Sequence, residues 1–287
     1  MASSDPLPPP HGNLLDTEEA AEITRLLEQD KILTQAIGHL IPEELDISSM
    51  EQVLDIGCGP GGWALDVAFT YPHLQVQGID INHTMANFAN ARARSQYLNN
   101  ATFLLKDARD QFDTDDSTVD FVNARTIFVF MDQQSWPALI AECWRILKPG
   151  GTLCITEAEI VISNSPAMQQ LNRFLSQSLY TQGRTFSVDG HSFGVAFMLK
   201  KLLMNASFEN IRHKAFSLDA SYGSDAHYNA CKDGEIFFQI VKPHLVASGI
   251  VEEAEFDRLY YEMLIDTLSD DYTCITFGLS AWGSKPQ

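Results

Sequence analysis

The chain has 287 residues, of which 45% are hydrophobic and 20% are charged, a composition typical of globular proteins with a large core. Its 38 acidic residues outnumber the 19 basic ones, and a net charge of −19 would repel nucleic acids and anionic lipid surfaces. The five scattered cysteines include no CxxC pair, which argues against a disulfide framework and a structural zinc site. We therefore expect a cytoplasmic monomer or weak dimer that acts on a small molecule, with no metal, nucleic-acid or membrane partner.

The first 48 residues divide into two parts. Residues 1–13 are rich in proline and lack both a basic start and an apolar run, so we expect a disordered leader rather than a signal peptide or membrane anchor. Residues 14–48 are predicted to form a helical cap, because Asp16 and Glu19 are a candidate capping pair and apolar residues follow at roughly helical spacing.

Between residues 50 and 160, short apolar runs alternate with longer helix-like stretches. This alternation indicates a parallel sheet covered on both faces, which binds its ligand at the carboxyl ends of the strands. The predicted elements are a strand at 52–57, a helix from 62 to about 70, a strand at 75–81, a helix at 87–98, strands at 101–108 and 119–128, a helix at 136–147, a turn at 148–151 and a strand at 152–159.

The pattern changes after residue 159, where helical stretches interrupt the strands. Helices are predicted at 165–182, 193–206, 225–247 and 252–268, and strands at 208–218 and 273–283. We therefore expect an α/β fold with a doubly wound, mostly parallel, seven-stranded sheet over residues 49–287. Helical cap insertions at about 160–205 and 219–270 would cover the carboxyl edge of the sheet.

A glycine-rich turn links the first predicted strand to the first predicted helix. Gly57, Gly59 and Gly62 match the pattern GxGxxG, and Asp80 ends the next strand about 20 residues later. Such a turn brings backbone N–H groups and a helix N-terminus to an anionic ligand, and the carboxylate can accept both hydroxyls of a ribose. A tight turn with a capping aspartate is the simpler alternative.

Asp55 distinguishes between two candidate nucleoside cofactors, NAD and S-adenosylmethionine (SAM). It stands two residues before Gly57, where it would lie close to a bound pyrophosphate, and like charges ~4 Å apart at a dielectric constant of ~20 repel by about 4 kcal/mol. NAD is therefore disfavoured. SAM has no phosphate: its carboxylate can meet the helix N-terminus, while acidic oxygens face its ammonium and sulfonium groups. Asp55 could also cap the turn through backbone N–H groups.

Five segments follow one another between about residues 50 and 160: "VLDIGCGPGGWALDVA", "VQGIDI", "FLLKDARD", "VDFVNAR" and "RILKPGGTLCITE". In this order they resemble the class I, Rossmann-like SAM-dependent methyltransferases. The helix "EITRLLEQDKIL" followed by the glycine turn further resembles a bacterial small-molecule subgroup. Family members often carry an N-terminal aromatic residue over the cofactor, whereas this chain has "NLLD".

The resemblance implies a role for each matching residue. The methionine end of SAM would be held by the turn that contains Asp55, Gly57, Cys58 and Gly59, and the ribose by Asp80. The remaining implied residues are Ile81 packing on the adenine, Asp107 with Ala108 at its exocyclic amine, and Asn123, Ala124 and Arg125 lining the approach to the methyl group.

Methyl transfer requires in-line positioning and, for a hydroxyl acceptor, removal of a proton. The candidate bases in the predicted caps are His191, His227, Tyr222 and Tyr228, although each single histidine is more often structural. Glu157 and Glu159 end the fifth strand near the same cleft, where one could orient a substrate or bind a cation, or both could form a solvated rim. The caps carry many aromatic and few basic residues, so we expect O- or C-methylation of a small, largely apolar metabolite.

Three other functions remain open at this point. A cyclase or isomerase could keep SAM as a fixed positive charge and transfer no methyl group. An NAD-linked oxidoreductase is opposed by Asp55 and by the lack of a recognisable hydride-transfer constellation. A regulatory protein could bind the cofactor without catalysis.

Overall fold

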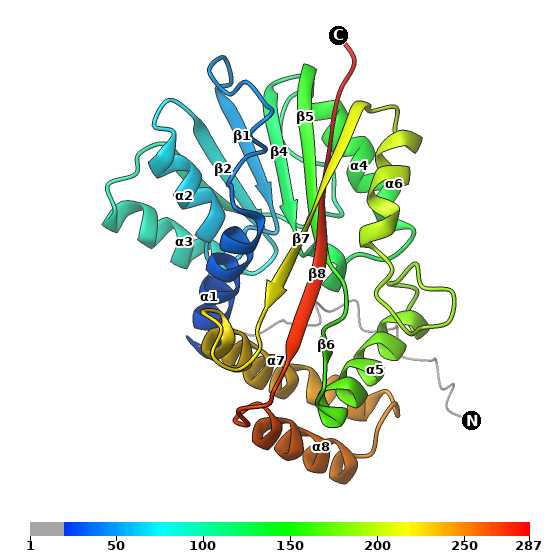
Figure 1. The fold of residues 1–287 in the computed structure, drawn as a ribbon. Helices are drawn as coiled ribbons and strands as arrows, with labels where there is room; N and C mark the ends of the chain where they lie inside the picture. Colours follow the sequence, from blue (N-terminus) through cyan, green and yellow to red (C-terminus); the bar gives the residue numbers. More distant parts are fainter. Residues whose placement is uncertain (1–19) are drawn as a thin grey trace, which may run out of the picture.

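A computed structural model describes residues 20–287 (Figure 1). The predicted leader at 1–13 and the candidate capping pair Asp16 and Glu19 lie outside the described residues. The first described helix is α1 (Ala20–Ile37), which confirms the helical stretch predicted before the glycine turn.

A single twisted sheet runs through the molecule, with the strand order β3-β2-β1-β4-β5-β8 and with β7 on the far side of β8 (Figure 1). The strands from β3 to β5 are parallel, whereas β8 is antiparallel to both β5 and β7. The strands are β1 (Gln52–Ile56), β2 (Gln75–Asp80), β3 (Ala101–Leu105), β4 (Val119–Arg125), β5 (Leu147–Ala158), β6 (Ile162–Ser163), β7 (Glu209–Asp219) and β8 (Cys274–Ser284).

The predicted sheet of seven strands gains an eighth. The additional strand, β6, has two residues and pairs with Cys274 and Ile275 of β8. Because β7 also pairs with Ile275, β6 lies on the other side of β8, in line with β5. The doubly wound, mostly parallel α/β fold is confirmed, and the correction is a short extension beside β8 that was too small to appear in the sequence pattern.

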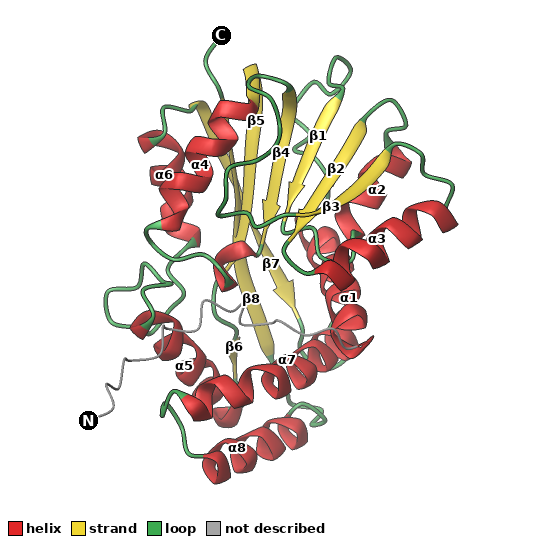
Figure 2. Ribbon diagram, turned by 180° about the vertical axis from the view of Figure 1, so that it is seen from behind, coloured by secondary structure: helices red, strands yellow, loops and turns green. Residues whose placement is uncertain are grey.

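Helices cover the two faces of the sheet unequally. Helices α2 (Gly62–Thr70) and α3 (His83–Ser95) lie on one face, and α4 (Ser135–Ile146) and α6 (Leu199–Asn205) lie on the other (Figure 2). The expected cover on both faces is incomplete, because the connection from β3 to β4 contains no helix. Leu104 of β3 consequently has about half of its surface exposed.

Several boundaries differ from the predictions: α3 spans His83–Ser95 rather than 87–98, and β3 and β4 end at Leu105 and Arg125 rather than at 108 and 128. The helix predicted at 193–206 is shorter, since a 3-10 turn at Ala196–Met198 precedes α6. The turn predicted at 148–151 is a bulge inside β5, where pairing with β4 moves from Leu147 directly to Thr152.

Alternation along the strands divides the core. Successive residues Phe121 and Val122 of β4 belong to separate apolar clusters, because side chains of a strand alternate between its faces. One cluster includes Trp63 of α2, and the other includes Trp136 of α4. This packing fixes the strand ends that carry the candidate site.

The caps gather at the carboxyl edge of the sheet. Helices α5 (Pro166–Thr181), α7 (His227–Ala247) and α8 (Glu253–Asp266) lie together below this edge, and α1 runs alongside α7 (Figures 1 and 2). They therefore form a second layer over the strand ends. Within residues 20–287, none of the helices combines the length and apolar composition needed to cross a membrane.

Candidate active site

The glycine turn has a backbone that only glycine adopts without strain. Gly57, Gly59 and Gly61 have φ angles of 66°, 51° and 78°, in the left-handed region. A Cβ atom on Gly57 would lie 3.2 Å from side-chain atoms of both Ile127 and Phe130. The turn is therefore shaped by its glycines, and it leads directly into the N-terminus of α2 at Gly62.

Asp80 joins the end of β2 to this turn. Its two carboxylate oxygens accept hydrogen bonds from the backbone N–H groups of Gly59 and Asn82, each at 2.8 Å. Burial raises the pKa of Asp80, while these two hydrogen bonds act in the opposite direction. Each oxygen retains a further lone pair, so the carboxylate can hold the turn and still accept a ligand hydroxyl.

Asp55 lies at the end of β1 and is buried. The Nδ2 group of Asn123 donates a hydrogen bond of 2.8 Å to its Oδ1 atom. Burial raises the pKa of Asp55 to about 7, and the nearby carboxylate of Asp80 adds to this rise. A cationic ligand group beside Asp55 would therefore favour its charged form.

Gly57 lines three cavities, two small ones and a larger one that is described below. A small cavity of about 60 Å³ lies between the turn and α1 and is lined in part by Asp55, Cys58 and Gly59. Another, of about 30 Å³, is lined by Asp80, Ile81, Asp107 and Ala108 among others. Burial raises the pKa of Cys58, which keeps it a neutral thiol. The structure thus brings together the residues predicted for the two ends of the cofactor.

Asp107 has a partner that the sequence analysis did not foresee. Its carboxylate accepts hydrogen bonds from the Nη2 and Nε groups of Arg109, at 2.6 and 3.0 Å. Hydrogen bonding to this guanidinium lowers the pKa of Asp107. Phe130 lines the same small cavity.

Arg125 connects β4 to α1. Its guanidinium forms an ion pair with Asp30 and donates a hydrogen bond of 2.9 Å to the hydroxyl of Thr34. Burial lowers the pKa of Arg125 to about 9. The neighbouring carboxylate of Asp30 acts in the opposite direction, because a nearby negative charge favours the charged guanidinium. Arg125 lines the main cavity, whereas Ala124 is enclosed in the core and does not line it. Asn123 does not line the main cavity either, and the place of both residues beside the methyl group stays a prediction.

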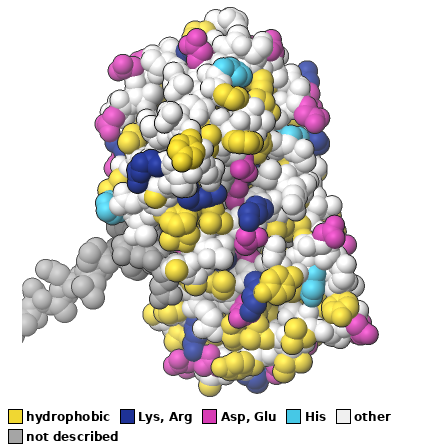
Figure 3. Space-filling view, turned by 90° about the vertical axis from the view of Figure 1, so that its left-hand side faces the viewer, with side chains coloured by type: hydrophobic (Ala, Val, Ile, Leu, Met, Phe, Trp, Pro, Cys, Tyr) yellow, Lys and Arg dark blue, Asp and Glu magenta, His cyan; other side chains and the backbone are white. Residues whose placement is uncertain are grey.

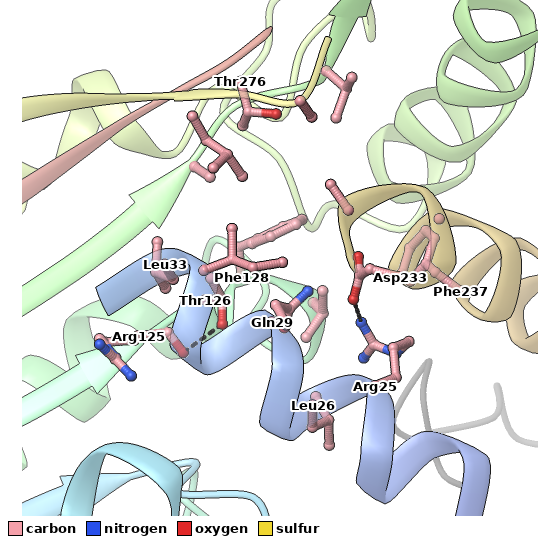
Figure 4. Close-up of a pocket in the computed structure, with 18 of the residues that line it drawn as sticks. Arg25, Leu26, Gln29, Leu33, Arg125, Thr126, Phe128, Asp233, Phe237 and Thr276 are labelled. Atoms are coloured by element: carbon pink, nitrogen blue, oxygen red, sulfur yellow. Dashed lines mark hydrogen bonds and ion pairs between the residues drawn. The ribbon is translucent and has the colours of Figure 1, made fainter. Parts of the chain in front are cut away.

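The main cavity, of about 300 Å³, extends from the glycine turn to α7. Figure 4 shows lining residues from α1, such as Leu26 and Gln29, and from α7, such as Asp233. Its wall is largely apolar, with contributions from the sheet and from helices α1, α5 and α7. The aromatic lining residues are Phe128, Phe130, Phe193, Phe216, Phe237, Phe238 and Tyr272. The charged lining residues are Glu22, Arg25, Asp80, Arg125, Glu159 and Asp233.

The structure does not bring the four candidate bases to this cavity. His191 lies in an exposed loop, and Tyr222 and Tyr228 are 52% and 71% exposed. The ring of His227 contacts the carbonyl oxygen of Ala220. None of the four lines the cavity, so the structure does not support the predicted catalytic set.

The two glutamates at the end of β5 have different environments. Glu157 is fully buried, and its Oε1 atom accepts hydrogen bonds from the N–H groups of Ile127 and Phe128. It therefore supports the turn after β4 rather than forming a solvated rim. Glu159 lines the cavity and accepts hydrogen bonds from the N–H groups of Gly194 and Ala196.

Several polar residues that line the main cavity were not predicted from the sequence. Arg25 and Gln29 belong to α1, whereas Asp233 belongs to α7. The helical spacing of α1 places Arg25 and Gln29, four residues apart, on one face of the helix. The sequence therefore shows that Arg25 and Gln29 share a helix face. It does not show that this face contacts α7, because the sequence of neither helix specifies its partner.

Comparison with known proteins identifies the domain. Residues 53–151 match the family described as "Methyltransferase domain". Over 181 residues the chain is 24% identical to methyltransferase pytC of Aspergillus terreus, a match that covers 62% of this chain and 52% of that protein. Over 138 residues it is 30% identical to a demethylmenaquinone methyltransferase of Symbiobacterium thermophilum, which covers 47% of this chain and 50% of that protein. The chain thus spans about half the length of these relatives.

The fold also resembles a solved structure. Phosphoethanolamine N-methyltransferase 2 of Haemonchus contortus, in complex with phosphomonomethylethanolamine and S-adenosylhomocysteine, aligns with a TM-score of 0.52 and 17% identity. The alignment covers 96% of this chain and 60% of that chain, and it shows a common fold. Residues 53–151 therefore contain a methyltransferase domain, and the alignment shows that the chain has the Rossmann-like fold of this SAM-dependent enzyme.

Proposed function

We propose that the protein transfers a methyl group from SAM to a small, largely apolar acceptor by O- or C-methylation. The observation that carries this proposal is a cavity that connects the glycine turn and Asp80 with an aromatic chamber lined by residues of α1, α5 and α7. One end of the cavity has the polar groups that suit a nucleoside and an amino acid. The other end has room for an apolar molecule.

The residues at the turn fit SAM. Asp55 is a buried carboxyl group with a pKa of about 7 and with Asn123 as a neutral partner, so an ammonium group beside it would be stabilised. The backbone at the start of α2 suits a carboxylate. Asp80 would hold the ribose, and Ile81 and Asp107 would contact the adenine. When bound, SAM supplies an electrophilic methyl group.

The chain's contribution is then to position the acceptor and to exclude water. The helices α1, α5 and α7 close the carboxyl edge of the sheet above the turn. Of the described residues that line the cavity, Glu159 is fixed by two backbone N–H groups. These two hydrogen bonds hold the carboxylate of Glu159 in place at the cavity wall. Its oxygens are the candidate proton acceptor for a hydroxyl substrate.

The charges of the cavity disfavour an anionic acceptor. Two basic residues line the described cavity, and both have acidic partners: Arg25 pairs with Glu22 and Asp233, and Arg125 pairs with Asp30. A phosphate such as that of the ligand bound to the Haemonchus contortus enzyme would have to compete with these carboxylates.

Release of S-adenosylhomocysteine tests the proposal. The full chain would be incubated with SAM and with separate panels of apolar alcohols, phenols, isoprenoids, polyketide fragments and small anionic acids. We expect turnover with members of the apolar panels. Turnover confined to the anionic acids contradicts the proposed acceptor class, and conversion of an acceptor without S-adenosylhomocysteine would support the alternative of a SAM-bound cyclase or isomerase.

We further propose that the protein acts as a monomer or weak dimer, in the cytoplasm and without nucleic acid. On the face that carries α3, basic side chains are scattered among acidic and hydrophobic ones (Figure 3). This distribution and the net charge of −19 support the proposal. A filter-binding signal with DNA or RNA that weakens as salt increases would contradict it.

A further inference from the structure

Glu22, Arg25 and Asp233 form a network of ion pairs in the wall of the main cavity, in the part proposed to hold the acceptor (the acceptor chamber). None of the three residues is proposed to bind the cofactor. The Nε and Nη2 groups of Arg25 donate to the two carboxylate oxygens of Glu22, at 2.6 and 2.8 Å. Its Nη1 group donates to Oδ1 of Asp233 at 2.8 Å. These contacts join residues of α1 and α7 that are 208 positions apart in the sequence.

The network carries more negative than positive charge. It has two carboxylates and one guanidinium, and Arg25 already uses three of its N–H groups within it. The side chains of Glu22 and Arg25 are each 1% exposed. An excess of one negative charge beside an apolar chamber is unfavourable unless a hydrogen-bond donor or a cation reaches it.

Asp233 is the member of the network that a ligand can reach. Its side chain is 24% exposed and lines the cavity. One carboxylate oxygen bonds to Arg25 while the other points away from it (Figure 4). Gln29 also lines the cavity, and a carboxylate with four lone-pair sites can still accept from a ligand.

The chamber around Asp233 suits the apolar body of such a ligand. The ring of Phe237 belongs to the same helix and lies beside the network, with its centroid 5.7 Å from Cζ of Arg25. Leu26, next to Arg25, would lie 3.7 Å from a Cβ atom on Gly59. The network therefore adjoins the cofactor turn, and aromatic faces near it favour a cation.

From this geometry we propose that Asp233 anchors the acceptor by binding a protonated amine on an otherwise apolar molecule. This inference rests on the proposed function and narrows its acceptor class. Arg25 and Glu22 act through Asp233: they hold its carboxylate at the wall of the chamber. The ammonium group supplies the positive charge that the network lacks, and the aromatic side chains enclose the rest of the molecule.

Two matched compounds test the proposal. The dissociation constants of 3-phenylpropylamine and 3-phenylpropan-1-ol would be measured at pH 7 by calorimetry on the full chain, with and without S-adenosylhomocysteine. We expect the amine to bind the wild-type protein at least about tenfold more tightly than the alcohol, because hydrogen bonds to charged groups are stronger than neutral ones. Equal binding, or binding of neither compound, would overturn the proposal.

The variant Asp233→Asn removes the charge and keeps the shape of the side chain. It should reduce the preference for the amine to about twofold or less and leave the affinity for the alcohol and for S-adenosylhomocysteine unchanged. The control Asp257→Asn alters a carboxylate of α8 that pairs with Lys242 of α7, and should preserve the preference. An undiminished preference in Asp233→Asn contradicts the anchor.

Failure of the anchor and failure of the proposed function have different signatures. If S-adenosylhomocysteine binds and methyl transfer occurs but the amine is not preferred, only the anchor fails. If the amine is preferred but neither SAM nor S-adenosylhomocysteine binds, the proposed function fails instead. Should Asp233→Asn not fold, the amine preference of the wild-type protein and its loss with increasing salt still decide the question.

Discussion

The cofactor end and the acceptor end of the cavity are held together in different ways. At the cofactor end, Asp80 accepts hydrogen bonds from backbone N–H groups of Gly59 and Asn82, within one strand-turn-helix-strand motif. At the acceptor end, side chains pair across long sequence separations, as in Arg25 with Asp233. The first end is determined by local backbone geometry. The second is determined by the packing of the cap helices, such as α1 against α7.

The largest effect is expected from breaking a long-range pair. In Asp30→Ala, Arg125 would remain buried without its carboxylate, which should lower the free energy of unfolding by about 3 to 5 kcal/mol. The control Asp257→Asn breaks a more exposed ion pair with Lys242 and should cost at most about 1 kcal/mol. Urea unfolding would compare them, and equal losses would show that the Arg125 contact does not fix α1.

Removing the local carboxylate tests the cofactor end. Asp80→Ala should weaken binding of S-adenosylhomocysteine by about 1.5 to 3 kcal/mol, the range for a hydrogen bond with a charged partner. Because Gly59 and Asn82 also lose an acceptor, the melting temperature should fall as well. Calorimetry and thermal unfolding measure the two effects. A lower melting temperature with unchanged affinity would make Asp80 purely structural.

Two glycine substitutions separate backbone strain from the binding site. Gly57 and Gly223 both have positive φ angles, but a Cβ atom would have close neighbours only at Gly57. Each change to alanine should cost about 1 to 2 kcal/mol of stability through the left-handed backbone. Only Gly57→Ala should also abolish binding of S-adenosylhomocysteine. Intact binding by Gly57→Ala would place the cofactor elsewhere.

The smallest effect is a dependence on pH. The pKa of Asp55 is about 7 in the folded protein, above its ordinary value of 3.8, so the fold favours the protonated form. Stability from this group is therefore present below about pH 4 and decreases as pH rises to about 7. A bound ammonium group favours the carboxylate instead, so cofactor affinity should fall by up to about tenfold per pH unit below pH 7.

The control for this pH dependence is Asp55→Asn, which cannot titrate. Its affinity for S-adenosylhomocysteine should be weaker at pH 8 and nearly constant between pH 6 and pH 8. An identical pH profile in the variant and the wild-type protein would assign the titration to another group.

The same contrast explains what the sequence could predict. The glycine turn, Asp55 and Asp80 were predicted together because their spacing along one motif fixes their positions in space. Every long helix and strand of the caps was also predicted from periodicity, apart from the two-residue β6. Periodicity shows which face of a helix is apolar, but not which other helix that face meets.

The predicted bases illustrate this limit. Tyr222 and Tyr228 were chosen because they lie in a cap segment, yet both side chains are largely exposed. Asp233, a few residues further along, faces the cavity because α7 packs against α1. The identity of a cavity residue in the caps therefore depends on tertiary packing, whereas the cofactor residues depend on local chain geometry.

Calorimetric titration of the full chain with SAM, S-adenosylhomocysteine and NADH tests the central claim most directly. Binding of SAM and S-adenosylhomocysteine at one site per chain, lost in Gly57→Ala and kept in Gly223→Ala, is the predicted result, with no binding of NADH. Strong binding of NADH without binding of SAM or S-adenosylhomocysteine would contradict the assignment of the glycine turn to SAM.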